Sequence, residues 1–170
     1  MIYAGIGARK TPANILEKMV SIGRYMADHG HILRSGAADG ADAAFEEGCR
    51  QHDGQCEIYL PWKGFNNHPS GWSNLSLRAY DMAVEHHPNW DALSSGASKM
   101  MVRNSYQVMG RDCRTPADLI ICWTPGGRIT GGTGQALRIA QGQSIPVINF
   151  GNLEFDEVRE RIYEVIGQPE

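Results

Sequence analysis

A repeated succession of apolar segment, glycine-bearing loop and helical segment constrains the fold of this chain most strongly. Such apolar segments predict strands at residues 1–5, 31–36, 56–61, 117–124 and 144–150. Helices are expected at residues 13–30, 41–52, 134–141 and 155–166. Because the strands are apolar throughout and separated by helices, they are expected to be parallel and covered on both faces. We therefore predict an α/β fold, a Rossmann-like three-layer sandwich with a mostly parallel sheet.

The segment at about 61–97 breaks this rhythm directly after the third predicted strand. It holds three of the four tryptophans and is expected to be helical around 74–86, before a further helix at 98–112. A chain of 170 residues suits one hydrophobic core, so we predict a single Rossmann-like domain, 1–170, with an insertion at about 61–97. At the carboxyl edge of the sheet, such an insertion is expected to act as a lid or specificity element.

Charge and apolar patterning exclude several classes of protein. The formal net charge of -3 argues against a general electrostatic grip on duplex nucleic acid. No run approaches 18 apolar residues and the N-terminus lacks a signal-peptide pattern, so a cytoplasmic protein without a membrane partner is predicted. The cysteines lack the paired spacing of a zinc site, and we expect reduced thiols, no metal and no cofactor. They are Cys49, Cys56, Cys113 and Cys122.

Three glycine-bearing loops follow predicted strands, at 5–9, 35–42 and 125–134. In a parallel sheet all three emerge at the same edge. Their backbone N–H groups, together with the partial positive charge of the helix that follows, can hold a phosphate without a surplus of basic side chains. The third loop has neither the dinucleotide fingerprint nor the Walker lysine, and each loop taken singly is equally well explained as a tight turn.

Polar and aromatic side chains near these loops have two interpretations each. Asp39 and Asp42 either cap the second helix or bind a ribose hydroxyl or base amine. Thr133 either caps the helix that follows it or, like Thr130, bonds a phosphate oxygen. Trp62 either stacks on a base or packs the insertion against the sheet.

Two arginines complete the candidate site. Arg9 follows the first loop, and Arg103 stands beside Asn104 in a methionine-rich helix; each is either a solvated charge or a grip on phosphate. The predicted nucleotide-binding residues are Gly5, Gly7, Arg9, Ser35, Gly36, Asp39, Gly40, Asp42, Trp62, Arg103, Asn104, Gly126, Gly127, Thr130, Gly131, Gly132, Thr133 and Gly134.

Five stretches, taken in order, resemble the superfamily that joins DNA-processing protein A to the LOG-type, lysine-decarboxylase-like proteins. They are "GIGARKTP", "LRSGAADGADAAFEEG", "YLPWKGFNN", "MMVRNSYQVM" and "PGGRITGGTGQALRIA". The resemblance is strongest to the DNA-processing protein A core, and it implies a Rossmann-like fold and a homodimer. It also implies one pocket around Gly5, Gly7, Arg9, Ser35, Gly36, Gly40, Asp42, Arg103 and Asn104.

One position separates this chain from the LOG branch. The resemblance places the catalytic glutamate of that branch three residues after Thr133, where this chain has Ala136. Without a carboxylate there, cleavage of an N-glycosidic bond lacks the group that stabilises the developing positive charge, unless Asp39, Asp42 or Glu46 replaces it.

The sequence therefore favours a protein that binds a nucleotide or a nucleotide derivative. Two alternatives stay open. One is an N-glycoside hydrolase that acts on a nucleoside monophosphate or an ADP-ribose-type compound. The other is a single-stranded DNA-binding recombination mediator. The predicted partners are accordingly a nucleotide-like small molecule or single-stranded DNA, and a second copy of the chain.

Overall fold

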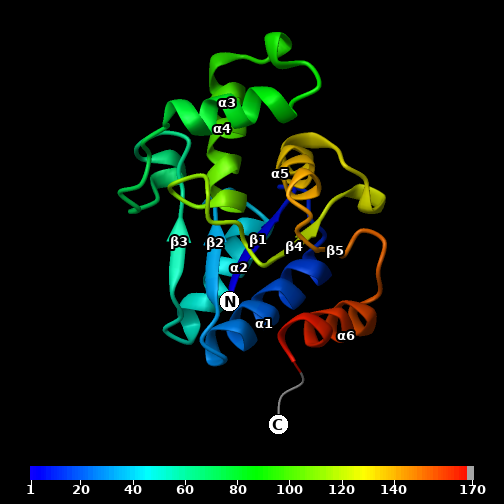
Figure 1. The fold of residues 1–170 in the computed structure, drawn as a ribbon. Helices are drawn as coiled ribbons and strands as arrows, with labels where there is room; N and C mark the ends of the chain where they lie inside the picture. Colours follow the sequence, from blue (N-terminus) through cyan, green and yellow to red (C-terminus); the bar gives the residue numbers. More distant parts are fainter. Residues whose placement is uncertain (168–170) are drawn as a thin grey trace.

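The computed structural model describes residues 1–167, which form three layers (Figure 1). The middle layer is a parallel sheet in the order β3-β2-β1-β4-β5. Its strands are β1 (Ile2–Gly7), β2 (Ile32–Ser35), β3 (Cys56–Ile58), β4 (Leu119–Trp123) and β5 (Val147–Asn149). The α-helices are α1 (Ala13–Asp28), α2 (Ala41–Gln51), α3 (Leu77–His86), α4 (Ser95–Met109), α5 (Gly131–Gly142) and α6 (Phe155–Ile166). The predicted Rossmann-like three-layer sandwich is confirmed, and every strand pair in it is parallel.

Alternating side chains of each strand enter two separate cores. Ala4 of β1 and Ile120 of β4 pack with α3, α4 and α5 on one face of the sheet. Tyr3 and Leu119 pack with α1, α2 and α6 on the other face. Because both faces are covered, the central strands β1 and β4 are apolar throughout. Toward the β3 edge, Arg34 of β2 and Glu57 of β3 form an ion pair at 2.7 Å.

Gly5 in the centre of β1 brings α2 close to the sheet. A Cβ at Gly5 would lie 2.5 Å from Cγ of Phe45, a fully buried residue of α2. Gly7 has the same role at the end of the strand, where a Cβ would lie 2.6 Å from Cβ of Ala41. These two glycines are therefore needed for close packing between helix and strand.

The segment between β3 and β4 forms helices whose starts are set by serine caps. The Ser76 side chain accepts the Ala79 N–H at 3.2 Å, so α3 begins at Leu77. Ser94 caps α4 in the same way, and this helix begins before the predicted residue 98. The α3 helix packs against α4 and α5. The segment at 61–96 therefore extends the α4–α5 layer outward (Figure 1).

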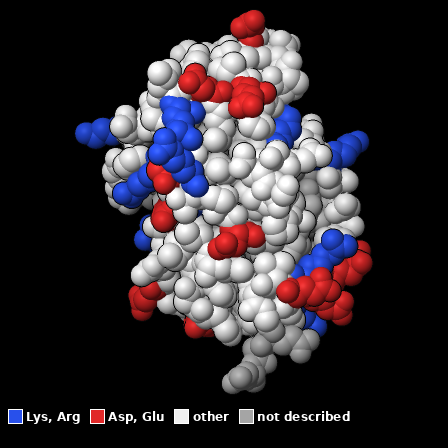
Figure 2. All heavy atoms as spheres, viewed as in Figure 1, with Lys and Arg blue, Asp and Glu red and all other residues white. Residues whose placement is uncertain are grey.

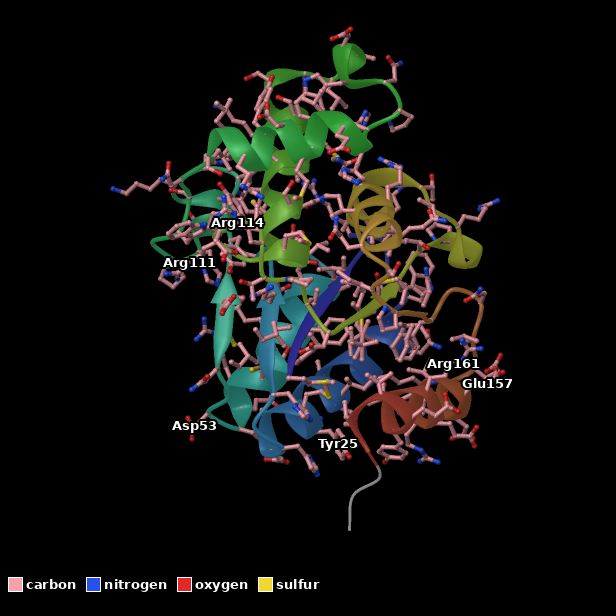
Figure 3. All side chains as sticks on the ribbon, viewed as in Figure 1. Tyr25, Asp53, Arg111, Arg114, Glu157 and Arg161 are labelled. Carbon is pink, nitrogen blue, oxygen red and sulfur yellow. The ribbon has the colours of Figure 1, made fainter. Side chains whose placement is uncertain are left out.

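Charges of both signs are interspersed on the face shown in Figure 2. Basic side chains gather beside acidic ones near the end of α4, where Arg111 and Arg114 are labelled in Figure 3. Within residues 1–167, no helix is long and apolar enough to cross a membrane. The four cysteines are free thiols, and in the described part of the chain no cluster of His, Cys, Asp and Glu has the geometry of a metal site.

Candidate functional site

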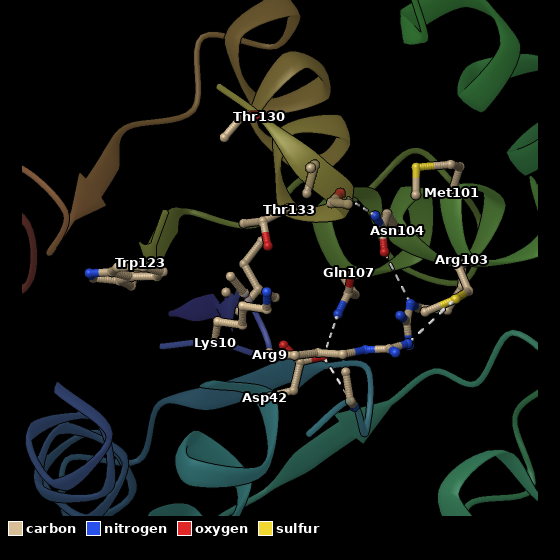
Figure 4. A pocket seen from close by; sticks show the side chains of 18 of the residues that line it. Arg9, Lys10, Asp42, Met101, Arg103, Asn104, Gln107, Trp123, Thr130 and Thr133 are labelled. Atoms are coloured by element: carbon tan, nitrogen blue, oxygen red, sulfur yellow. Dashed lines mark hydrogen bonds between the residues drawn. The ribbon is translucent and has the colours of Figure 1, made fainter. Parts of the chain in front are cut away.

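A pocket of about 530 Å³ opens at the carboxyl ends of β1 and β4 (Figure 4). Its walls are the loop after β1, the first turn of α2, one face of α4, and the loop and first turn of α5 after β4. In the sheet, β2 lies on one side of β1 and β4 lies on its other side, so the chain adds strands in opposite directions before and after this point. The pocket therefore lies where the strand order reverses, which is where open α/β sheets bind ligands. Its volume is typical of small-molecule sites.

The structure brings part of the predicted site together at this pocket. The predicted residues that line it are Gly7, Arg9, Asp42, Arg103, Asn104, Thr130, Gly131, Gly132 and Thr133. Those that lie outside the lining are Gly5, Ser35, Gly36, Asp39, Gly40, Trp62, Gly126, Gly127 and Gly134. The loop at 35–42 reaches the pocket only through Ala38 and Asp42.

Several predicted residues outside the lining stabilise the walls. The buried Ser35 hydroxyl donates to the Gly5 carbonyl at 2.7 Å and ties β2 to β1. Gly40 precedes α2 with a φ of +84°, and a Cβ there would lie 2.8 Å from the Arg9 carbonyl oxygen. Gly126 and Gly127 also have positive φ and form the turn after β4. These residues shape the loops that form the pocket walls, and they do not themselves line the pocket.

Trp62 lies away from the pocket. Its side chain is 40% exposed and meets Phe65 edge-on, with ring centroids 5.2 Å apart. Of the insertion predicted at about 61–97, Ala97 of α4 is the residue that the pocket lining includes, so the rest of the segment does not cover the pocket as a lid. The aromatic side chain that does line it is Trp123, the last residue of β4. Sequence reasoning missed this residue, although its position at a strand end was a usable signal.

Asp42 lies on the pocket floor and is only 3% exposed. Its Oδ2 accepts the Ala38 N–H at 3.5 Å and Nε2 of Gln107 at 3.3 Å, and the N–H groups of Gly7 and Gly36 also bond the carboxylate. Burial raises the pKa of Asp42 to about 6, against the opposing effects of Arg103 and these N–H groups. The backbone N–H groups of the first two glycine loops thus hold a carboxylate of the protein itself.

Arg103 is buried near this carboxylate, and hydrogen bonds to the protein engage two of its three guanidinium nitrogens. One terminal nitrogen donates to the carbonyls of Gly36 and Tyr59, and Nε donates to Oδ1 of Asn104 at 3.1 Å. Burial lowers the pKa of Arg103, and the charge of Asp42 acts in the opposite direction. In this geometry Arg103 joins two loops to α4, and its charge lowers the pKa of Asp42. Arg103 also lines the pocket, and its predicted contact with a phosphate stays a prediction.

The N-terminus of α5 is open toward the pocket. Thr130 precedes the helix but its side chain makes no capping bond, and Thr133 lies in the first turn. Within the described chain, no hydrogen bond engages the N–H groups of Gly131, Gly132 and Thr133. Asn104 holds this turn in place by donating to the Gly132 carbonyl at 2.9 Å. Free N–H groups and the helix dipole are the features that favour an anion at a helix N-terminus.

Two exposed cations stand at the same pocket. Arg9 and Lys10 follow β1 directly, and one terminal nitrogen of Arg9 lies 3.8 Å from Sδ of Met100. Figure 4 shows Arg9 extending from the loop after β1 toward Arg103. The charged residues of the lining are Arg9, Lys10, Arg103 and Asp42, so the cations are in excess at the pocket although the net charge of the chain is -3. Lys10 was absent from the predicted set, although its place beside Arg9 signalled a pair of cations.

The fold and this pocket invite comparison with known proteins. No protein-family model matches the chain, and neither does any curated protein sequence. Two structures of the molybdenum cofactor carrier protein of Chlamydomonas reinhardtii match with TM-scores of 0.56 and 0.55 and identities of 16% and 15%. Both alignments cover 96% of this chain, and they cover 82% and 83% of the carrier protein.

A second kind of protein matches equally well. DNA processing protein A of Helicobacter pylori, described with its single-stranded DNA binding mode, has a TM-score of 0.58 at 18% identity. The alignment covers 95% of this chain and 72% of that protein. The chain shares their fold. The resemblance to DNA-processing protein A that the sequence motifs predicted is thereby confirmed at the level of the fold.

Proposed function

We propose that the pocket binds the phosphate group of a small nucleotide or nucleotide derivative. One observation carries this proposal: the uncapped N-terminus of α5 and two exposed cations, Arg9 and Lys10, face the same space. Free N–H groups supply directed donors, and the cations supply charge without a competing exposed carboxylate in the lining. A phosphate matches both requirements.

The rest of the lining suits a planar, largely apolar group. Met100 and Met101 of α4 line one side, and Trp123 lines another (Figure 4). Trp123 is half-buried: it packs partly against the core that α1, α2 and α6 cover, and it also lines the pocket, where it can contact a planar group. A ligand with a phosphate at one end and a heterocycle at the other fills such a pocket. A carrier of a small cofactor and a protein that binds single-stranded DNA share the fold, which agrees with a ligand of this class.

The two alternatives have less support. Ala136 lines the pocket where the LOG resemblance implies a glutamate, and Glu46 is paired with Arg50 and His68 away from the lining. Asp39 is exposed outside the pocket, which leaves Asp42, enclosed by N–H groups, as the carboxylate in the described lining. Binding without bond cleavage is therefore preferred. DNA binding is disfavoured by the net charge of -3.

Titration calorimetry with matched ligands tests the proposal. We expect AMP or GMP to bind, and the corresponding nucleoside, which lacks the phosphate, to bind at least about 10-fold more weakly. Lys10→Ala and Arg9→Ala are each expected to weaken nucleotide binding by about 10-fold, whereas Arg161→Ala on α6 provides a matched control without effect. Equal affinity for nucleotide and nucleoside, or unchanged affinity in both pocket variants, would overturn the proposal.

Two further measurements separate the remaining possibilities. Mass spectrometry of small molecules released from the denatured protein identifies a retained ligand, and chromatography of the nucleotides after incubation detects any free base. Binding of a single-stranded oligonucleotide that falls steeply with salt would support the DNA alternative. The homodimer stays a prediction, which sedimentation velocity tests.

A further inference from the structure

Cys49 and Cys56 lie side by side at the opposite end of the sheet from the pocket. Cys49 is near the end of α2, and Cys56 is the first residue of β3. Cys56 Sγ donates a hydrogen bond to Cys49 Sγ at 3.2 Å. Because a disulfide bond is about 2.05 Å long, the two sulfurs need to approach by only about 1 Å to become bonded.

The loop between the two cysteines is shaped around the sulfur of Cys49. A Cβ at Gly54 would lie 2.5 Å from Cys49 Sγ, so only a residue without a side chain lets the loop close over it. Cys49 itself is fully buried, whereas Cys56 is partly exposed on β3, an edge strand of the sheet. Asp53 of the same loop lies at the surface in Figure 3. A small reagent can therefore reach Cys56 first.

We propose that Cys49 and Cys56 form a reversible disulfide in exchange with a low-molecular-weight disulfide such as oxidised glutathione. The thiolate of Cys56 attacks one sulfur of glutathione disulfide, forms a mixed disulfide and releases one glutathione thiolate, which takes up a proton. The thiolate of Cys49 then attacks Sγ of Cys56 and releases the second glutathione. Two protein thiols are oxidised, and one glutathione disulfide is reduced to two glutathione thiols.

The electrostatics of the pair suit the second step. The hydrogen bond from Cys56 lowers the pKa of the Cys49 thiol, and the charge of Arg50 acts in the same direction against burial. Once Cys56 is bonded to glutathione it donates no such hydrogen bond, and the charge of Arg50 is then what favours a thiolate at Cys49 beside the mixed disulfide. The hydrogen bond that Cys56 donates to Cys49, together with burial, raises the pKa of Cys56, so the first attack at Cys56 is assigned from its exposure and not from a low pKa. Burial also raises the pKa of Cys122 to about 12 and that of Cys113, and Cys113 and Cys122 are buried. These two cysteines serve as internal references that stay reduced.

Peptide mapping of the full-length protein tests the proposal. The protein is equilibrated with oxidised glutathione, the remaining thiols are alkylated, and the chain is digested with trypsin. Cleavage after Arg50 places Cys49 on the peptide 35–50 and Cys56 on the peptide 51–63, so the disulfide appears as a cross-linked pair. We expect this pair, an intact mass lower by two hydrogen atoms, and full reversal by dithiothreitol.

Single variants test the order of the two steps. Cys49→Ser is expected to accumulate a glutathione adduct on Cys56, because the resolving thiol is missing. Cys56→Ser is expected to accumulate at least about 10-fold less adduct on the buried Cys49 over the same time. Absence of the cross-linked pair at a high ratio of oxidised to reduced glutathione would overturn the proposal. Equal adducts in the two variants would overturn the assigned order of attack.

Discussion

Replacing Asp42 with asparagine is expected to change how the stability of the protein depends on pH. Burial raises the pKa of Asp42 from 3.8 to about 6, so the folded protein holds this proton more tightly than the unfolded chain does. The contribution of the protonated carboxyl is therefore fully present below about pH 4 and is lost as the pH rises through about 6. Asparagine has nearly the same shape and does not titrate, so the variant lacks this dependence.

The magnitude follows from the two pKa values. They differ by roughly two pH units, and each unit corresponds to about 1.4 kcal/mol. Ionisation of Asp42 is therefore expected to cost the folded protein about 3 kcal/mol at neutral pH, with the attraction to Arg103 and the backbone N–H groups already included. This is a large share of the stability of a typical domain.

Urea denaturation of both proteins at several values between about pH 4 and 7.5, followed by tryptophan fluorescence, measures the effect. We expect the free energy of unfolding of the wild type to fall by about 2 to 3 kcal/mol relative to Asp42→Asn across this interval. The contributions of other titrating groups are the same in both proteins, so they cancel when the two free energies of unfolding are subtracted. An effect of the substitution that does not depend on pH does not change how this difference varies with pH. If the unfolding free energy of the wild type minus that of Asp42→Asn stays constant or rises with pH, then Arg103 and the N–H groups outweigh burial at Asp42, and the reasoning is refuted.

Three further substitutions test the packing and hydrogen bonds that hold the pocket in place, each by urea denaturation. Gly5→Ala adds a methyl group against the Phe45 ring and is expected to destabilise the protein by about 1–3 kcal/mol; a neutral result would show that α2 shifts freely. Asn149→Ala leaves the buried N–H of Thr124 without its acceptor at 3.1 Å, with an expected cost of about 2 kcal/mol. Tyr106→Phe removes a hydroxyl that accepts the N–H of Ser76, the residue before α3, at 2.6 Å. The free energy of unfolding is expected to fall by about 1–3 kcal/mol, and an unchanged urea midpoint would contradict this role of Tyr106.

The fold was predictable because the central strands β1 and β4 are buried on both faces, which leaves continuous apolar segments in the sequence. The boundaries were less predictable, since they depend on single capping side chains. Ser94 starts α4 earlier than the apolar pattern suggests, and α5 begins at Gly131 without any side-chain cap. Glycine in a first turn has low helix propensity, so the residue pattern does not indicate a helix before residue 134.

The candidate site was predictable as a location but only partly as a set of side chains. The loops after β1 and β4 meet because the strand order reverses there. Trp62 follows β3, the edge strand, and the chain after it leads away from that junction. The role of Asp42 was hidden because it depends on the conformation of two separate loops whose N–H groups converge on one carboxylate. The spacing of residues along the chain does not predict that these N–H groups meet at Asp42.

The pairing of β1 with β4 has a consequence for folding. Tyr3 pairs with Leu119, and the Ile2 N–H donates to Asp118 Oδ2 at a sequence separation of 116. The pairs among β1, β2 and β3 need much shorter loops, so we expect them to form first and the β1–β4 junction to form last. The pocket spans that junction and is absent until it closes. A ligand held by Lys10 on one side and by Gly132 on the other would bind only the completed sheet, and would couple its own binding to the final step of folding.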